Sequence, residues 1–163
     1  MSELTTPAIE AAIDAGIAHR VVRTEAAGSA EEAAALQGIP LPALLRTIVV
    51  RRGADDYLFV LMPAGRRFDW PKLRAHLGVS RLSLPDADEA RAVTGYERYT
   101  ITPFGATRAW PVIADASILD QPVVSVGAGV RGVSLHLAPP DLVRSLGADV
   151  VDVSQQEVHG AGD

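Results

Sequence analysis

Cysteine is absent from the chain, and this absence excludes several kinds of chemistry at once. Without a thiol there can be no disulfide, no thiolate nucleophile and no cysteine-based zinc site. Lysine is scarce as well, because Lys72 is the single lysine among 15 basic residues. The other basic residues are arginines, which is a bias typical of a GC-rich genome. This bias matters for the interpretation of Arg46.

Long apolar runs and an excess of positive charge are also missing. No run approaches the roughly 18 uncharged residues that a membrane span needs, and residues 1–6 lack the basic region and apolar block of an export signal. The formal net charge is −5, so the field of the whole molecule repels a polyanion. We therefore expect a cytoplasmic protein that uses no membrane and no DNA as a partner.

The motifs of several common enzyme classes do not occur either. There is no Gly-x-Ser-x-Gly elbow, no phosphate-binding Walker loop and no Gly-x-Gly-x-x-Gly fingerprint. The histidines lack the i, i+4 spacing of a helical metal site; they are His19, His76, His136 and His159. His136 alternates with two leucines, which favours a structural role. We expect no metal centre, and these patterns alone leave the function undecided.

What is present indicates one folded domain. The length of 163 residues and a hydrophobic content of 48% suffice for a single packed core. We expect a domain over residues 1–153 and a flexible tail over residues 154–163. Helix capping signals predict helices at about residues 6–15, 29–38, 69–78, 86–95 and 141–146.

Apolar runs between these helices predict the strands. They cover residues 19–23, 44–50, 57–62, 81–84, 110–114, 122–126, 132–137 and 149–153, and the second and third form a hairpin. Several strands follow one another through turns too short for parallel crossovers. The prediction is an α+β fold with a mixed, strongly curved, barrel-like sheet flanked by helices.

Several short blocks in a fixed order carry a resemblance to a known family. The blocks are residues 33–36 before a glycine, 45–50, 66–69, 94–96 leading to 102–105, 111–115, the turn 127–129 and 141–142. From residue 24 to residue 153, their order and spacing resemble the YbaK family of trans-editing aminoacyl-tRNA deacylases. These are free-standing relatives of the editing domain inserted in bacterial prolyl-tRNA synthetases.

The resemblance implies hydrolysis, in trans, of the ester that joins a mischarged amino acid to the 3′-terminal ribose of tRNA. It also implies the YbaK-type fold and no metal or organic cofactor. Oriented water and backbone amides aimed at the developing oxyanion are enough to lower the barrier of such a reaction. The expected partner is the aminoacyl-tRNA acceptor end, with affinity borrowed from an aminoacyl-tRNA synthetase or an elongation factor.

The first departure from the family pattern is Arg46. The family carries a lysine needed for deacylation, in a Lys-Thr or Lys-Ser pair, whereas this chain has Arg46-Thr47. A guanidinium keeps its charge and its hydrogen-bond donors but does not act as a base, so Arg46 is expected to bind the substrate carbonyl or terminal phosphate. Alternatively, genomic bias replaced a lysine that was no longer under selection.

The second departure is Tyr99-Thr100, where relatives commonly place a Gly-Gly pair. Glycines would let backbone amides approach the ester closely, whereas side chains restrict φ and crowd the pocket. Tyr99 either reshapes the amino-acid site and contacts the substrate, or packs on the surface of a degenerate loop.

The resemblance assigns three groups of candidate residues. The candidate catalytic residues are Arg46, Thr100 and Gly105. The candidate substrate-binding residues are Thr47, Tyr99, Thr102, Pro103, Phe104, Asp115, Gly127 and Gly129. The candidate contacts to tRNA phosphates are Arg51, Arg52, Arg66 and Arg67, with a solvated basic rim as the alternative.

Two functions remain open on this basis. The first is an aminoacyl-tRNA deacylase that acts in trans, with a small or medium amino acid as the substrate. The second is a catalytically silenced module that binds an aminoacylated tRNA end, an amino acid or a nucleotide, and the two departures favour it.

Overall fold

The protein is described here by a computed structural model that covers residues 5–156. Within this range the α-helices are α1 (Pro7–Asp14), α2 (Ala30–Gln37), α3 (Trp70–Leu77), α4 (Ala87–Thr94) and α5 (Pro139–Leu146). Short 3-10 helices cover η1 (Leu41–Ala43) and η2 (Ala116–Asp120). All five predicted helices are confirmed.

The caps explain where the helices begin and end. The side chains of Thr6, Ser29, Asp69 and Asp86 each accept a hydrogen bond from the backbone amide three residues later. At the other end, a left-handed glycine terminates each of the helices α2, α3, α4 and α5. These signals are local, which is why the sequence alone locates the helices.

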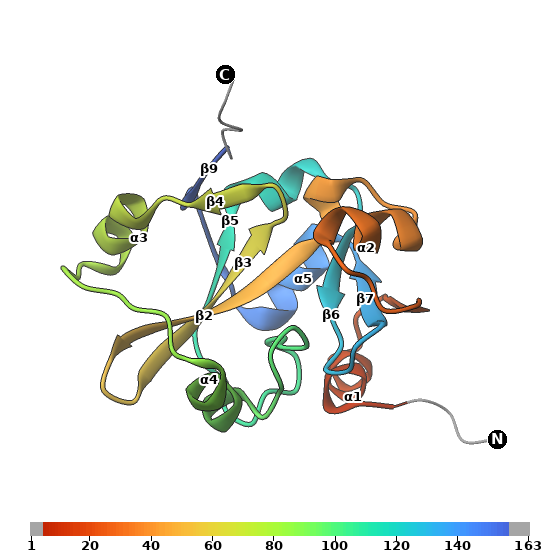
Figure 1. Ribbon diagram of the computed structural model, residues 1–163, viewed down its shortest axis with the longest axis horizontal. Coiled ribbons are helices and arrows are strands. Elements are labelled where there is room, and N and C mark those ends of the chain that lie inside the picture. Colours follow the sequence, from red (N-terminus) through yellow and green to blue (C-terminus); the bar gives the residue numbers. More distant parts are fainter. Residues whose placement is uncertain (1–4, 157–163) are drawn as a thin grey trace.

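The strands form three sheets. Their bounds are β1 (Arg20–Arg23), β2 (Leu45–Gly53), β3 (Asp56–Pro63), β4 (Arg66–Phe68), β5 (Val112–Asp115), β6 (Val124–Gly127), β7 (Val133–Leu137), β8 (Asp149–Val151) and β9 (Ser154–Gln156). The orders are β1-β7-β6, β2-β3-β5-β8 and β4-β9. In Figure 1 the four-stranded sheet crosses the centre of the molecule, and β6 and β7 lie on its right.

The four-stranded sheet is mixed. The hairpin β2-β3 is antiparallel, as predicted, whereas β3 pairs in parallel with β5, and β5 in parallel with β8. The long connections between the parallel strands contain α3 and α4, and then β6, β7 and α5. The α+β class and the mixed pairing are therefore confirmed.

Three details of the prediction are wrong. Within residues 5–156 no sheet closes or curls into a barrel, because β2 and β6 meet through one isolated bridge, Leu44 with Ser125, rather than a ladder. Residues 81–84 supply only a single bridge, from Ser83 to Arg51. Residues 154–156 of the predicted tail form β9 on β4, and residues 157–163 lie outside the described range.

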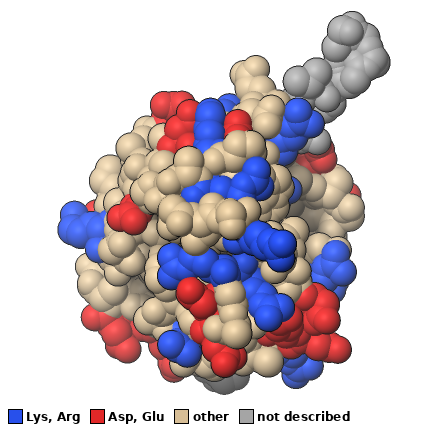
Figure 2. Space-filling view, turned by 90° about the vertical axis from the view of Figure 1, so that its left-hand side faces the viewer, with Lys and Arg blue, Asp and Glu red and all other residues tan. Residues whose placement is uncertain are grey.

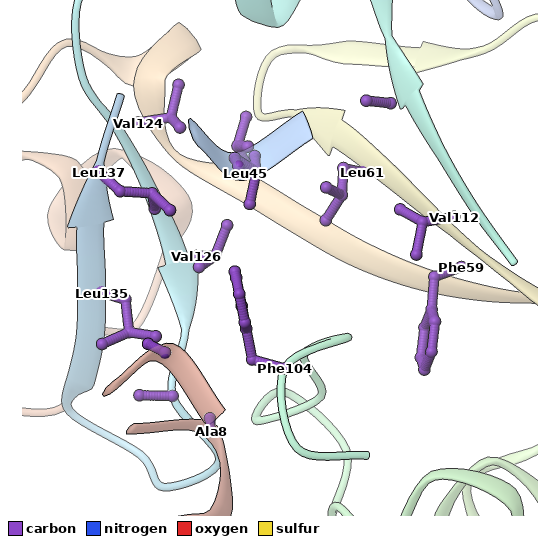
Figure 3. Packing of buried hydrophobic residues seen from close by; sticks show 14 of the residues in the cluster. Ala8, Leu45, Phe59, Leu61, Phe104, Val112, Val124, Val126, Leu135 and Leu137 are labelled. Atoms are coloured by element: carbon purple, nitrogen blue, oxygen red, sulfur yellow. The ribbon is translucent and has the colours of Figure 1, made fainter. Parts of the chain in front are cut away.

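The core has two parts, because β3 is buried on both faces. Phe59 and Leu61 face a large cluster between the two main sheets, shown in Figure 3, together with side chains of β6 and β7. Leu58 and Val60 face a smaller cluster under α3. Burying each such side chain stabilises the fold by about 2 kcal/mol. The double burial explains the continuous apolar run in β3.

Hydrogen bonds of the Gln37 side chain link α2 to two buried polar residues of the three-stranded sheet. The Gln37 side-chain oxygen accepts a hydrogen bond from Ser125 Oγ at 2.6 Å and lies 2.8 Å from His136 Nε2. Burial, with a smaller contribution from Arg20, lowers the pKa of His136. His136 is thus a neutral, structural histidine.

Among residues 5–156, no helix combines the length and the apolar character needed to cross a membrane. Cellular location stays a prediction.

Candidate functional site

Arg46 lies on β2, close to the point where β2 meets β6. The side chain is exposed, although its neighbour Leu45 belongs to the core. Its Nη2 atom donates a hydrogen bond to the backbone carbonyl of Arg66 at 2.7 Å. Within the described residues this is the single hydrogen bond of a guanidinium that has five N–H donors, so most of its donors remain free for a ligand.

Thr47 follows on the same strand, and its side chain therefore points to the opposite face of β2. Its hydroxyl oxygen is buried and has no hydrogen-bond partner within residues 5–156. A buried hydroxyl without a partner costs roughly 1–3 kcal/mol. The two members of the Arg46-Thr47 pair thus face different surroundings.

Asp115 is almost completely buried, with a relative exposure of 1%. One carboxylate oxygen accepts the Val153 amide at 3.0 Å, and the other accepts both the amide and the hydroxyl of Ser117. The Nε atom of Arg66 lies 3.8 Å from Asp115 and donates to Ser154 Oγ at 2.6 Å. These contacts join β4, β5 and β9, so both carboxylate oxygens of Asp115 are occupied by hydrogen bonds within the protein.

The residue blocks that suggested the site come together in space. The Leu44–Ser125 bridge sets β6 beside the start of β2, and Arg46 and Gly127 lie two residues beyond it on each strand. A Cβ atom on Gly127 would stand 3.3 Å from the carbonyl oxygen of Ile101 and 3.5 Å from that of Thr100. The strand β2, the end of β6 and the loop after α4 therefore meet at one place.

The second half of the loop after α4 is anchored in the core. Phe104 is 3% exposed and points toward Val126 and Leu45 in Figure 3. The Tyr96 hydroxyl donates to the Phe104 carbonyl at 2.7 Å, and the Thr102 hydroxyl accepts from the Phe104 amide at 3.3 Å. Burial raises the pKa of Tyr96 to about 12, so Tyr96 stays a protonated donor at neutral pH.

Two glycines allow this packing. Gly129 has a φ of +88°, and a Cβ atom there would lie 2.6 Å from a ring carbon of Tyr96. Gly105 has a φ of +69°, and a Cβ atom there would lie 2.4 Å from the backbone of Pro7, at the start of α1. Gly105 is exposed but packs closely against the start of α1, and Pro103 is buried, so both residues position the loop.

The first half of the loop differs from the second. Tyr99 has a φ of +69°, which is a genuine outlier for a bulky residue, and its side chain is 75% exposed. The turn is closed by the Thr100 amide and hydroxyl, which both donate to the Glu97 carbonyl, at 3.0 and 2.7 Å. The amide of Thr100, a candidate catalytic residue, is therefore engaged within the loop.

An open cleft of about 440 Å³ lies beside this turn. Its lining includes Thr100 and Gly129, which the sequence predicted, and also Arg91 and Arg131, which it did not. Both arginines are exposed, and Arg91 forms an ion pair of 4.0 Å with Glu97. A signal for Arg131 was present, because it lies two residues after the predicted turn 127–129, whereas nothing in the sequence places Arg91 near that turn.

The four predicted phosphate-binding arginines are not equivalent. Arg52 forms two hydrogen bonds with Asp56, at 2.9 and 3.0 Å, and this pairing raises the pKa of Arg52 and lowers that of Asp56. Arg51 lies 3.7 Å from Glu89, and Arg66 is held by Asp115 and Ser154 as described above.

Arg67 is exposed, with a 3.3 Å hydrogen bond to the Gln155 side chain. Figure 2 shows lysine and arginine side chains gathered across the middle of the face that carries α3 and the β2-β3 hairpin. Arg67, on β4, and Lys72, on α3, are exposed basic residues.

Among the described residues, no group of three histidine, cysteine or acidic side chains is placed to hold a metal ion. The donors that the region offers are guanidinium groups, hydroxyls and backbone amides. Such groups bind and orient oxyanions and carbonyl oxygens.

Comparison with known proteins gives consistent matches. The family model of the aminoacyl-tRNA editing domain matches residues 24–145. An Enterococcus faecalis protein, EbsC, whose name gives it provisionally as a Cys-tRNA(Pro)/Cys-tRNA(Cys) deacylase, is 23% identical over 129 residues, covering 79% of each chain.

Solved structures agree on the fold. A hypothetical protein of known crystal structure matches with a TM-score of 0.85 and 25% identity, covering 92% of this chain and all of the other. A candidate trans-editing enzyme for prolyl-tRNA synthetase matches with a TM-score of 0.85 and 24% identity, covering 94% of this chain and 99% of the other. The second match shows the fold alone.

Proposed function

We propose that this chain, which belongs to the aminoacyl-tRNA editing domain family, hydrolyses the ester of mischarged aminoacyl-tRNA in trans. The candidate trans-editing enzyme of the same fold is covered over 99% of its length, which supports action as a free-standing protein. The identity of the amino acid is left to experiment.

The observation that carries the proposal is the state of Arg46. It stands where the family carries its essential lysine, it is exposed, and a single hydrogen bond to the Arg66 carbonyl at 2.7 Å orients its guanidinium. The remaining N–H groups are preorganised donors for a carbonyl oxygen or a phosphate.

The reaction itself needs no covalent intermediate. A water oxygen attacks the ester carbonyl carbon, and the resulting oxyanion is stabilised by donors already in place. The bond from that carbon to the 3′-terminal ribose oxygen then breaks. The ribose oxygen takes up a proton, and the amino acid leaves as a carboxylic acid that ionises. In this scheme Arg46 stabilises negative charge and does not accept a proton.

A binding module without hydrolysis is the second candidate, and a specific observation favours it. The Thr100 amide donates to Glu97 within the turn at 3.0 Å, so it does not point freely at a substrate. In that case the protein would hold an aminoacylated tRNA end, an amino acid or a nucleotide and leave the ester intact.

The test is release of amino acid from a panel of mischarged tRNAs by the wild type, Arg46→Ala and Arg46→Lys. We expect the wild type to turn over and Arg46→Ala to lose about 100-fold or more in kcat/KM, the usual cost of one oxyanion donor. Arg144→Ala, an exposed arginine on α5, is the matched control and should stay within twofold.

Two results would overturn the deacylase. If the wild type is inert and Arg46→Lys restores hydrolysis, the chain is a silenced relative retained for binding. If neither the wild type nor Arg46→Lys acts on any substrate of the panel, the turn at Tyr99 and Thr100 also blocks the reaction. The proposal that the protein is an enzyme is then wrong.

A further inference from the structure

We propose that Tyr99 is a stacking platform for an unpaired nucleobase of the tRNA 3′ end, and that Arg98 and Arg131 bind the phosphates next to that base. The proposal rests on the tRNA substrate of the proposed function, but it does not require hydrolysis. It concerns a residue at which this chain departs from the family pattern.

The exposure of Tyr99 sets it apart from the other tyrosines. Tyr57 and Tyr96 are 4% and 5% exposed, whereas Tyr99 is 75% exposed. Its φ of +69° lies in the left-handed region, where a bulky residue is strained. Strain of this kind clusters at ligand clamps and active sites, where it preorganises a group for binding.

The charges around Tyr99 fit a nucleotide. The guanidinium carbon of Arg98 lies 4.9 Å from the centre of the Tyr99 ring, and that of Arg131 lies 5.7 Å from it. Both guanidinium groups lie over the ring, so a base that stacks on the ring displaces at least one of them toward the neighbouring phosphates. Aromatic rings and guanidinium groups together are the usual lining of a site for single-stranded nucleic acid. This local positive cluster exists in a chain whose formal net charge is −5.

The position of the cleft gives the bound strand a direction. Arg131 lies over the Tyr99 ring and also lines the cleft of about 440 Å³. Thr100, which follows Tyr99 in the chain, lines the same cleft. A volume of this size accommodates a group as large as one nucleotide. A base stacked on Tyr99 would therefore lead the terminal nucleotide past Gly129 toward the place where Gly127 adjoins Thr100 and Ile101.

The experiment measures equilibrium binding of three probes to the full chain. The probes are deacylated tRNA with an intact 3′ end, the same tRNA without its last three nucleotides, and adenosine monophosphate. The proteins are the wild type, Tyr99→Phe, Tyr99→Gly and Leu119→Ala. Glycine suits the positive φ, so Tyr99→Gly is expected to fold, and Leu119 is a 50% exposed apolar residue on η2 that serves as the control.

We expect Tyr99→Gly to weaken binding of intact tRNA by about 5- to 150-fold, the range for loss of one base–aromatic stack. Tyr99→Phe and Leu119→Ala should bind like the wild type. Truncated tRNA should bind the wild type and Tyr99→Gly equally weakly. Arg98→Gln and Arg131→Gln should each lower the slope of log affinity against log salt by about 0.7.

An equal loss with truncated tRNA, or unchanged binding by Tyr99→Gly, would overturn the platform. Tight binding of adenosine monophosphate that depends on Tyr99, without any gain from the rest of the tRNA, would assign the platform to a free nucleotide instead. These experiments measure binding alone. A wild type that binds tRNA through Tyr99 but releases no amino acid would therefore refute the deacylase proposal without refuting the stacking proposal.

Discussion

Positions 46 and 99 are those at which we predict departures from the family pattern, and the protein accommodates their side chains in opposite ways. Arg46 lies on a regular strand, and its guanidinium is oriented by the backbone carbonyl of Arg66, whose side chain contacts Asp115 and Ser154. Tyr99 lies in a strained turn, and its ring is 75% exposed.

Arg46 and Tyr99 differ in whether contacts within the protein explain their conformation. The contacts of Arg46 with its own protein already account for its orientation. Burial does not offset the strain at Tyr99, since the ring is exposed and contacts two exposed arginines. Stacking on a bound base would offset this strain, so Tyr99 carries more functional information than Arg46.

The largest effect is expected from breaking the network behind Arg46. Asp115→Ala should lower the free energy of unfolding by about 4 kcal/mol, because it removes a buried carboxylate that serves Ser117, Val153 and Arg66. Chemical denaturation measures this change. Asp120→Ala, an exposed neighbour on η2, should stay within about 0.5 kcal/mol. Equal effects of the two substitutions would show that the network does not hold this side of the site.

A smaller effect is expected at the anchored end of the loop that carries Tyr99. Gly105→Ala should lower the free energy of unfolding by about 3 kcal/mol, because a Cβ atom would lie 2.4 Å from the backbone of Pro7. Gly78→Ala is the matched control: its φ is +68° and no atom lies within 4 Å of its Cβ position, so it should cost only about 1 kcal/mol. If the two glycines cost the same, the loop is not anchored on α1.

The smallest effect has the opposite sign. Tyr99→Gly should raise the free energy of unfolding by about 1 kcal/mol, because glycine adopts a φ of +69° without strain. Asp55→Gly tests the same change at a φ of +54°, where aspartate is already tolerated, and should gain less. A loss of stability in Tyr99→Gly, measured by thermal unfolding, would mean that the tyrosine contacts stabilise the free protein.

Much of the fold could be predicted because its signals are local. The caps at Ser29 and Asp86 and the glycines at 38 and 95 define helix ends through hydrogen bonds within a few residues. The hairpin β2-β3 follows from two apolar runs and a short turn. The family blocks also predict Arg46, Tyr99, Thr100 and Gly129 as candidate site residues.

The remaining features depend on contacts between distant residues. The strand β9 pairs with β4 across almost 90 residues, and its three residues, Ser154, Gln155 and Gln156, carry no apolar pattern that would predict it. Arg91 joins the cleft only because α4 ends beside the turn after β6. Whether the amide of Thr100 is free or bonded also depends on the conformation of the turn.

The sequence by itself determined the helices, the hairpin, the family blocks and the lack of thiol chemistry, because each depends on residue type and on spacing within short segments. Three features depend on the tertiary structure. Asp115 is buried and hydrogen-bonded within the protein, and Arg46 and Thr47 face different surroundings. Tyr99 is exposed beside Arg131. These outcomes require strands and loops far apart in the chain to meet, and their energies arise only after the core has formed.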